Sequence, residues 1–289
     1  MKRFTYTVTG GEVTVFQSAL YRTNAAVVET EDVMLIVDPT WLPHEIEDIK
    51  RHVQARRGER KLLLLVTHSD FDHLIGCGAF PDAAAIGSSP LAVETDKQAK
   101  LAQIQAFDAQ YYIDRDDPIV YPDIRHAITE DGERLLFGST VLTFYMAPGH
   151  TKCGLFTVVE PAGIWLAGDY LSDFELPLIE HSAAAYENTL LKAFSIVEAH
   201  KARLLVPGHG APTEEPKEMH RRIAMAQSHI DRLRQAVRER DEAALGALGA
   251  AHAYPSPFME EAHELNVRLI REEEEGDGES LAHQVQERS

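Results

Sequence analysis

Four short apolar segments of this chain each run directly into a histidine or an aspartate. They are LLLLVT before the motif HSDFDH, FYMAPG before His150, IWLAG before Asp169 and LLVPG before His209. Short continuous apolar runs are typical of strands buried on both faces, and α/β proteins often place their chemistry at the carboxyl ends of such strands. We therefore expect four distant segments to contribute polar side chains to one site.

The polar residues at these four segment ends are types that bind transition metals. Imidazole nitrogens and carboxylates suit zinc, iron or manganese. A lone histidine after a strand is usually just a polar loop residue, but four such segments make coincidence a poor explanation. Seven ligands are too many for one tetrahedral ion and fit two ions that share a carboxylate. The candidates are His68, Asp70, Asp72, His73, His150, Asp169 and His209.

The composition excludes several classes of partner. The chain has 289 residues, 44% of them hydrophobic, which is enough for a sizeable core. Its formal net charge of −18 would repel phosphate backbones, so no nucleic-acid partner is expected. The longest apolar runs are too short to span a membrane, and the N-terminus has no apolar signal stretch. A cytoplasmic protein with a small-molecule substrate is expected, and a homodimer remains open.

The periodicity of apolar residues predicts alternating strands and helices. TYTVTGGEVTVFQ alternates around a Gly-Gly pair and predicts a hairpin. A further strand is expected near 119–121, and helical spacing predicts helices over 42–57, 90–107, 186–200, 219–237 and 259–274. This order suits two sheets sandwiched between helices. The expected organisation is a main domain over 1–240, a helical extension packed on it over 241–275 and a disordered acidic tail over 276–289.

The motifs resemble those of the metallo-β-lactamase superfamily. The first motif of that family reads H-x-H-x-D-H and appears here as HSDFDH, and APGHT, AGD and PGHG follow in the family's order. The segment TNAAVVETEDVMLIVDP resembles the family's early strand pair, which ends in an acidic residue, here Asp38. The resemblance covers roughly residues 12–213. It implies an αββα sandwich, here with extra C-terminal helices, and a metal-dependent hydrolase.

The resemblance also implies how the ligands divide between two divalent ions. His68, Asp70 and His150 would hold the first ion, Asp72, His73 and His209 the second, and Asp169 would bridge both. Asp72 would in addition orient the nucleophile or shuttle its proton. Asp38 is expected to support the ligands by hydrogen bonding, with a structural role at the strand end as the equal alternative.

Asp70 departs from the commonest family pattern, which has a second histidine at this place. A minority of the family carries a carboxylate there, including flavodiiron proteins and some phosphodiesterase-like members. The substitution adds a negative charge, so manganese or iron becomes plausible beside zinc. The alternative is that Asp70 does not reach the metal and that the first site is weak.

The resemblance implies hydrolysis by a hydroxide that bridges two ions. A small ester, thioester or lactone is the first choice of substrate and a phosphodiester the second. Iron redox chemistry of the flavodiiron type ranks third, because no flavin motif is present. The segment after Asp169 is expected to line the pocket, with Tyr170 and His181 as substrate contacts; packing and surface roles are the alternatives for these two residues.

Overall fold

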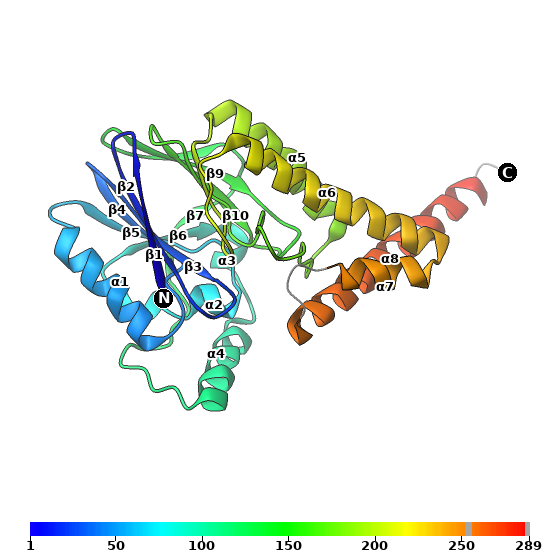
Figure 1. Cartoon of the computed structure of the whole chain (residues 1–289), viewed down its shortest axis with the longest axis horizontal. Helices are drawn as coiled ribbons and strands as arrows, with labels where there is room; N and C mark the ends of the chain where they lie inside the picture. Colours follow the sequence, from blue (N-terminus) through cyan, green and yellow to red (C-terminus); the bar gives the residue numbers. More distant parts are fainter. Residues whose placement is uncertain (252–255, 287–289) are drawn as a thin grey trace.

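Two β-sheets lie face to face in the computed structural model of this chain (Figure 1). The structure describes residues 1–251 and 256–286, and side chains as far as Gly276. The larger sheet has the strand order β1-β2-β3-β4-β5-β6-β7, formed by Lys2–Val8, Gly11–Gln17, Asn24–Thr30, Val33–Val37, Lys61–Leu65, Ala84–Ser88 and Ile124–Ile128. The smaller has the order β12-β11-β10-β9-β8, formed by Leu204–Val206, Ile164–Leu166, Leu155–Glu160, Thr140–Met146 and Glu133–Phe137.

Helices cover the outer faces of both sheets. The larger sheet carries α1 (Pro43–Arg56), and the short α2 (Phe71–Leu74), η1 (Cys77–Ala79) and α3 (Ser89–Ala92) follow its strands, with α4 (Lys97–Tyr111) at one end. The smaller sheet carries α5 (Ala183–His200) and α6 (Pro216–Glu239). This arrangement is the expected αββα sandwich.

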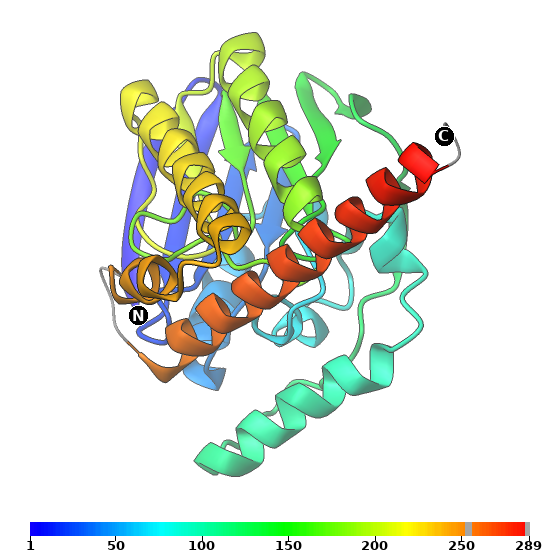
Figure 2. The same cartoon turned by 90° about the vertical axis from the view of Figure 1, so that its right-hand side faces the viewer.

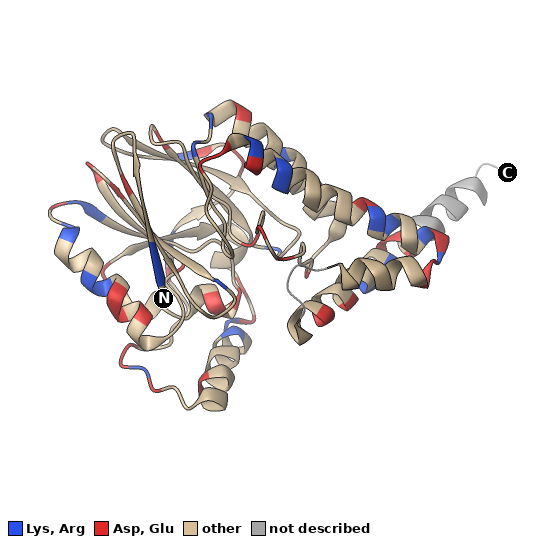
Figure 3. Cartoon of the chain, viewed as in Figure 1, with Lys and Arg blue, Asp and Glu red and all other residues tan. Residues whose placement is uncertain are grey.

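Three buried apolar clusters hold the layers together. The central one joins the two sheets and includes Leu35 and Leu63 from one and Phe144 and Leu166 from the other. A second lies under α1, which buries Ile46, Ile49 and Val53 at helical spacing. A third lies under α5 and α6. Figure 3 shows that the strands are mostly free of charge, whereas Lys, Arg, Asp and Glu lie along the helices and loops.

Two further helices extend the sandwich at its C-terminal end. They are α7 (Glu242–Ala250) and α8 (Pro257–Gln286), and α8 runs across the lower ends of α5 and α6 (Figure 2). The helix predicted over 259–274 is therefore longer at both ends. Most of the predicted disordered tail falls on the C-terminal part of α8, whose side chains, like residues 287–289, lie outside the described residues, so its disorder stays a prediction.

Two sequence-based predictions were wrong. The helix expected over 90–107 is two helices. The short α3 begins after Ser88, whose side chain caps it, and ends at Ala92, and α4 begins only at Lys97. The strand expected near 119–121 is irregular, and β7 begins only at Ile124. Pro118 and Pro122 flank that segment, and proline cannot donate to a strand ladder. None of the described helices has both the length and the apolar character needed to cross a bilayer.

The topology brings the four predicted segment ends together. β11 and β12 are parallel, and β9 runs in the same direction as β11 because both are antiparallel to β10. The loops after β9, β11 and β12 therefore leave the same edge of the smaller sheet. The loop after β5 leaves the facing edge of the larger sheet.

Candidate metal centre

Four buried histidines direct one ring nitrogen each toward the carboxylate of Asp169. The Nε2 atoms of His68 and His150 each lie 3.5 Å from Asp169 Oδ2, and that of His209 lies 3.2 Å away. His73 Nε2 lies 3.0 Å from Asp169 Oδ1. The carboxylate predicted to bridge two ions thus has histidines against both of its oxygens.

The other ring nitrogen of each histidine lies against an oxygen outside the cluster. His73 Nδ1 is 3.0 Å from Asp38 Oδ2, and His68 Nδ1 is 2.9 Å from Thr67 Oγ1. His150 Nδ1 and His209 Nδ1 are each 2.9 Å from a backbone carbonyl, those of Leu178 and Tyr21. Each oxygen can accept a hydrogen bond from a protonated Nδ1, and this tautomer leaves the Nε2 lone pair free for a metal.

Asp70 lies with the ligands of the first predicted ion. Its Oδ2 is 3.1 Å from His150 Nε2 and 3.6 Å from His68 Nε2. Its other oxygen, Oδ1, is 3.3 Å from Lys100 Nζ on α4. One oxygen therefore faces the cluster while the ammonium group balances the charge of the other. Among the described residues, His68, Asp70, His150 and Asp169 form one group that could hold a metal ion.

Asp72 lies with the ligands of the second predicted ion. Its Oδ2 is 3.3 Å from His73 Nε2 and 3.4 Å from His209 Nε2. These three residues form a second candidate group. Asp38, His68 and His73 form a third, but the oxygens of Asp38 accept hydrogen bonds from the Thr67 backbone, the Thr67 hydroxyl and His73. Asp38 is therefore suited to orient the His73 ring by a hydrogen bond to Nδ1, the nitrogen that faces away from Asp169.

Spacing and hydrogen bonding both fit bound cations. Ligand atoms about 2.0–2.2 Å from a tetrahedral ion lie about 3.3–3.6 Å from one another, and most nitrogen-to-oxygen separations here are 3.1–3.6 Å. In the described part of the chain, the buried Nε2 atoms of His68 and His150 make no hydrogen bond of suitable geometry, although carboxylate oxygens lie 3.1–3.6 Å away. Buried polar atoms are normally satisfied, so these two atoms are suited to coordinate a cation.

The electric field of the cluster favours cations. Burial lowers the pKa of His150, but contact with the Asp70 carboxylate outweighs burial and raises it to about 9. Burial also lowers the pKa of His73 and of His209. The negative charge of Asp169 outweighs this effect and raises both pKa values well above the usual range. Burial would raise the pKa of Asp169, but the surrounding histidines hold it well below the usual range. A site that retains protons so strongly also attracts metal ions, which compete for the same lone pairs.

Glycines let the ligand loops approach one another. A Cβ atom at Gly208 would collide with Asp169 Oδ1. Gly149, before His150, has a φ of 133° and lies against the backbone of Tyr186. A larger residue at either position would push a ligand loop out of place.

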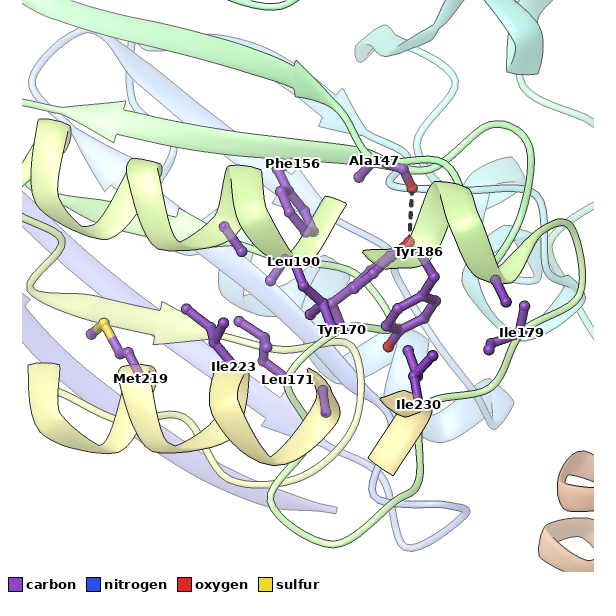
Figure 4. Close-up of a cluster of buried hydrophobic side chains, with 14 of the residues drawn as sticks. Ala147, Phe156, Tyr170, Leu171, Ile179, Tyr186, Leu190, Met219, Ile223 and Ile230 are labelled. Atoms are coloured by element: carbon purple, nitrogen blue, oxygen red, sulfur yellow. Dashed lines mark hydrogen bonds between the residues drawn. The ribbon is translucent and has the colours of Figure 1, made fainter. Parts of the chain in front are cut away.

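The structure does not place Tyr170 on the wall of the pocket. Its side chain is buried in the cluster under α5 and α6 and stacks on Tyr186 with ring centroids 4.3 Å apart (Figure 4). The hydroxyl donates to the Pro148 carbonyl at 2.9 Å and accepts from the His150 backbone nitrogen at 3.1 Å. Tyr170 therefore positions the His150 loop. His181 is exposed and also lies off the pocket wall.

The cavity at the candidate metal centre is also lined by charged residues that the sequence did not single out, among them Lys100 and two glutamates. Lys100, Glu175 and Glu180 line a cavity of about 730 Å³ that also contains Asp70, Asp72, Asp169 and His209. Burial raises the pKa of Glu175 to about 7. Both glutamates belong to the segment after Asp169 that was expected to line the pocket. Lys100 carries no motif, and only the tertiary fold brings α4 to Asp70.

Comparison with known proteins identifies the family. The family model of the metallo-beta-lactamase superfamily matches residues 19–209. The chain therefore belongs to the metallo-β-lactamase superfamily. No protein of curated function matches it in sequence.

Solved structures share this fold at low sequence identity. A metallo-beta-lactamase family protein from Thermus thermophilus is 18% identical, with 92% of this chain and 94% of that chain covered and a TM-score of 0.65. The inverting sec-alkylsulfatase Pisa1 from Pseudomonas sp. is 12% identical, with 93% and 49% covered and a TM-score of 0.66. A metallo-beta-lactamase from Pontibacter korlensis is 14% identical, with 78% and 99% covered and a TM-score of 0.54.

Proposed function

We propose that this protein is a metal-dependent hydrolase that uses two divalent ions to cleave a small ester, thioester or lactone. The observation that carries the proposal is the common orientation of four histidines, each with Nε2 toward Asp169 and Nδ1 toward an oxygen outside the cluster. Such orientation by outer hydrogen-bond partners is characteristic of metal ligands.

The bound ions would supply a nucleophilic hydroxide near neutral pH and polarise the oxygen of the scissile bond. His68, Asp70 and His150 would hold one ion, Asp72, His73 and His209 the other, and Asp169 both. Zinc is the first choice, and the carboxylate of Asp70 makes manganese or iron suitable alternatives.

Asp72 is the residue of this chain best suited to handle a proton during the reaction. Its Oδ2 atom contacts His73 and His209, and its side chain lines the cavity. The surrounding histidines keep its pKa below the usual range, although burial opposes them. An ionised Asp72 can accept a hydrogen bond from an attacking water and orient it toward the substrate.

The net charge of the chain supports a substrate that carries little negative charge. The formal charge is −18, so a polyanion would meet repulsion over the acidic surface as it approaches. Neutral or singly charged esters, thioesters and lactones avoid this cost.

The test is a comparison of esters, thioesters, lactones and a bis-phosphoester with the zinc, manganese and iron forms of the protein. We expect carboxyl-ester or lactone cleavage that Asp169→Asn abolishes and that Asp231→Asn, a change on the exposed face of α6, leaves intact. Cleavage of only the bis-phosphoester would move the function to phosphodiesterase. Oxygen reduction by the iron form without hydrolysis would contradict the proposal.

A further inference from the structure

The cavity at the candidate metal centre extends well beyond the ligands, and many of the other residues that line it are apolar, beside polar ones such as Arg221, His229 and Arg232. The C-terminal extension forms one wall of it, through Phe258, Met259 and Ala262 at the start of α8 and Leu248 on α7. Met225 on α6 and Leu176 in the loop after Asp169 continue this wall. A chain entering the cavity would therefore meet charge at the metals and apolar surface farther out.

Aromatic side chains from three separate segments continue this wall. Tyr21, in the loop between β2 and β3, lies with its ring centroid 5.4 Å from that of Phe258 and 6.1 Å from that of Trp41. Trp41 in turn lies 5.2 Å from Phe71, which precedes Asp72. All four residues line the cavity. The aromatic row thus leads from α8 to the metal ligands.

Several of these apolar side chains remain exposed in the cavity. Phe258 is 42%, Tyr21 47% and Met225 54% exposed. Single exposed apolar side chains are ordinary on a protein surface. Three that come from distant segments and line one cavity beside a metal centre indicate a ligand-binding surface, because each would gain from burial against an apolar ligand.

The wall formed by α8 is held in place. Asn266 is fully buried, donates to the Pro177 carbonyl at 2.6 Å and accepts from the Ile179 backbone nitrogen at 2.8 Å. Met259 and Ala262 are themselves buried. A wall fixed in this way can discriminate between ligands by length.

We infer that this part of the cavity, lined by Tyr21 and the first turns of α8, binds the apolar acyl chain of the substrate, and that Phe258 sets the preference for chain length. The inference rests on the proposed hydrolysis and narrows it to esters or thioesters with an acyl chain of several carbons. The carbonyl would lie at the metals, and the chain would run outward along Tyr21 and Phe258.

The first test measures kcat/KM for aryl esters of acetate, butyrate, hexanoate and octanoate. Each methylene that becomes buried should raise kcat/KM by about fourfold until the subsite is full. Phe258→Ala should lower kcat/KM for octanoate on the order of tenfold and leave acetate nearly unchanged. Phe194→Ala removes a comparably exposed ring, on α5 and outside the cavity, and is the matched control. A flat dependence on chain length, or equal effects of the two variants, would overturn the inference.

A second test does not depend on catalysis. Calorimetric titration of the metal-free protein with octanol, a neutral probe, should show binding with a negative heat-capacity change. Phe258→Ala should weaken that binding, and Phe194→Ala should not. Octanol binding without esterase activity would support the apolar subsite while the proposed reaction fails. Ester cleavage without octanol binding would overturn the subsite alone.

Discussion

Asp38 contacts two parts of the candidate metal centre, on the side of the histidines that faces away from Asp169. Its carboxylate accepts from His73 Nδ1 and from the Thr67 hydroxyl, which lies against His68 Nδ1. Its backbone has a φ of 42°, a conformation that asparagine also tolerates. Asp38→Asn should therefore keep the backbone while removing the charge that orients His73. We expect metal affinity to fall about 10- to 100-fold, measured by competition with a chelator. Unchanged affinity would assign Asp38 a purely structural role.

Asp70 is the ligand candidate that departs from the family's common pattern, and its contacts define a test. Asp70→Ala should lower the occupancy of one metal site and remove most of the activity, because His68 and His150 lose a shared partner. Asp70→His should keep metal binding and shift the preference toward zinc. Metal content and preference, measured by elemental analysis after loading with mixed ions, check both. If neither variant changes them, Asp70 does not bind the metal.

At the scale of elements, helix α6 ties together two loops that carry ligands. Arg222 is buried and donates to the carbonyls of Leu171, two residues after Asp169, and Ala211, two residues after His209. Glu218 pairs with Arg222 one turn away at 2.8 Å. The helix thus fixes the spacing of the two loops through one guanidinium group.

The pair on α6 predicts a pH dependence of stability. Hydrogen bonds from Arg221 and Arg222, which outweigh burial, lower the pKa of Glu218 to about 2 from a usual 4.5. Its contribution is therefore present above pH 4.5 and is lost as the pH falls through about 2. Glu218→Gln should cost on the order of 1 kcal/mol at pH 7, because the 27% exposed side chain is screened by solvent. Denaturant titrations should show this difference disappear near pH 2; a constant difference would contradict it.

Helix α8 supports the candidate metal centre through Asn266. Its side chain holds the backbone of Pro177 and Ile179, and the carbonyl of Leu178 between them accepts from His150 Nδ1. Asn266→Ala leaves two buried backbone groups unpaired and should cost about 1–3 kcal/mol of unfolding free energy. It should also weaken metal binding, whereas Glu264→Ala on the exposed face of α8 should do neither. If the variant loses stability but keeps its metal affinity, α8 stabilises the fold without supporting metal binding.

The sequence predicted the parts of this molecule that depend on local pattern. Strands that end in polar motifs, and the apolar stripe that begins at Met219, were recognisable because their periodicity is strong. Lys100 and Phe258 were not, because nothing in their local sequence distinguishes them; only tertiary packing brings α4 and α8 to the cavity. Tyr170 and Glu175 lie in the segment that was expected to line the pocket. The sequence could not tell that Tyr170 packs into the core and that Glu175 faces the cavity, because this depends on how the segment folds.

At the scale of the whole molecule, the sandwich and its C-terminal helices meet at one cavity. The two sheets supply the candidate ligands from the edges where their strands end, and α7 and α8 supply apolar side chains to its wall. A fold of this family hosts many reactions, so we expect the wall contributed by the extension to give this chain its own substrate preference. The division into a main domain over 1–240 and a helical extension packed on it over 241–275 stays a prediction.

The central claim is that the cluster around Asp169 holds two metal ions, and elemental analysis tests it most directly. The protein is purified without chelator, supplemented with zinc, manganese or iron, and freed of unbound ions before measurement. The account predicts close to two ions per chain for the preferred metal and a marked loss in Asp169→Asn, because both groups of ligands share this carboxylate. A protein that stays folded and binds no ion under any of these conditions would contradict the account.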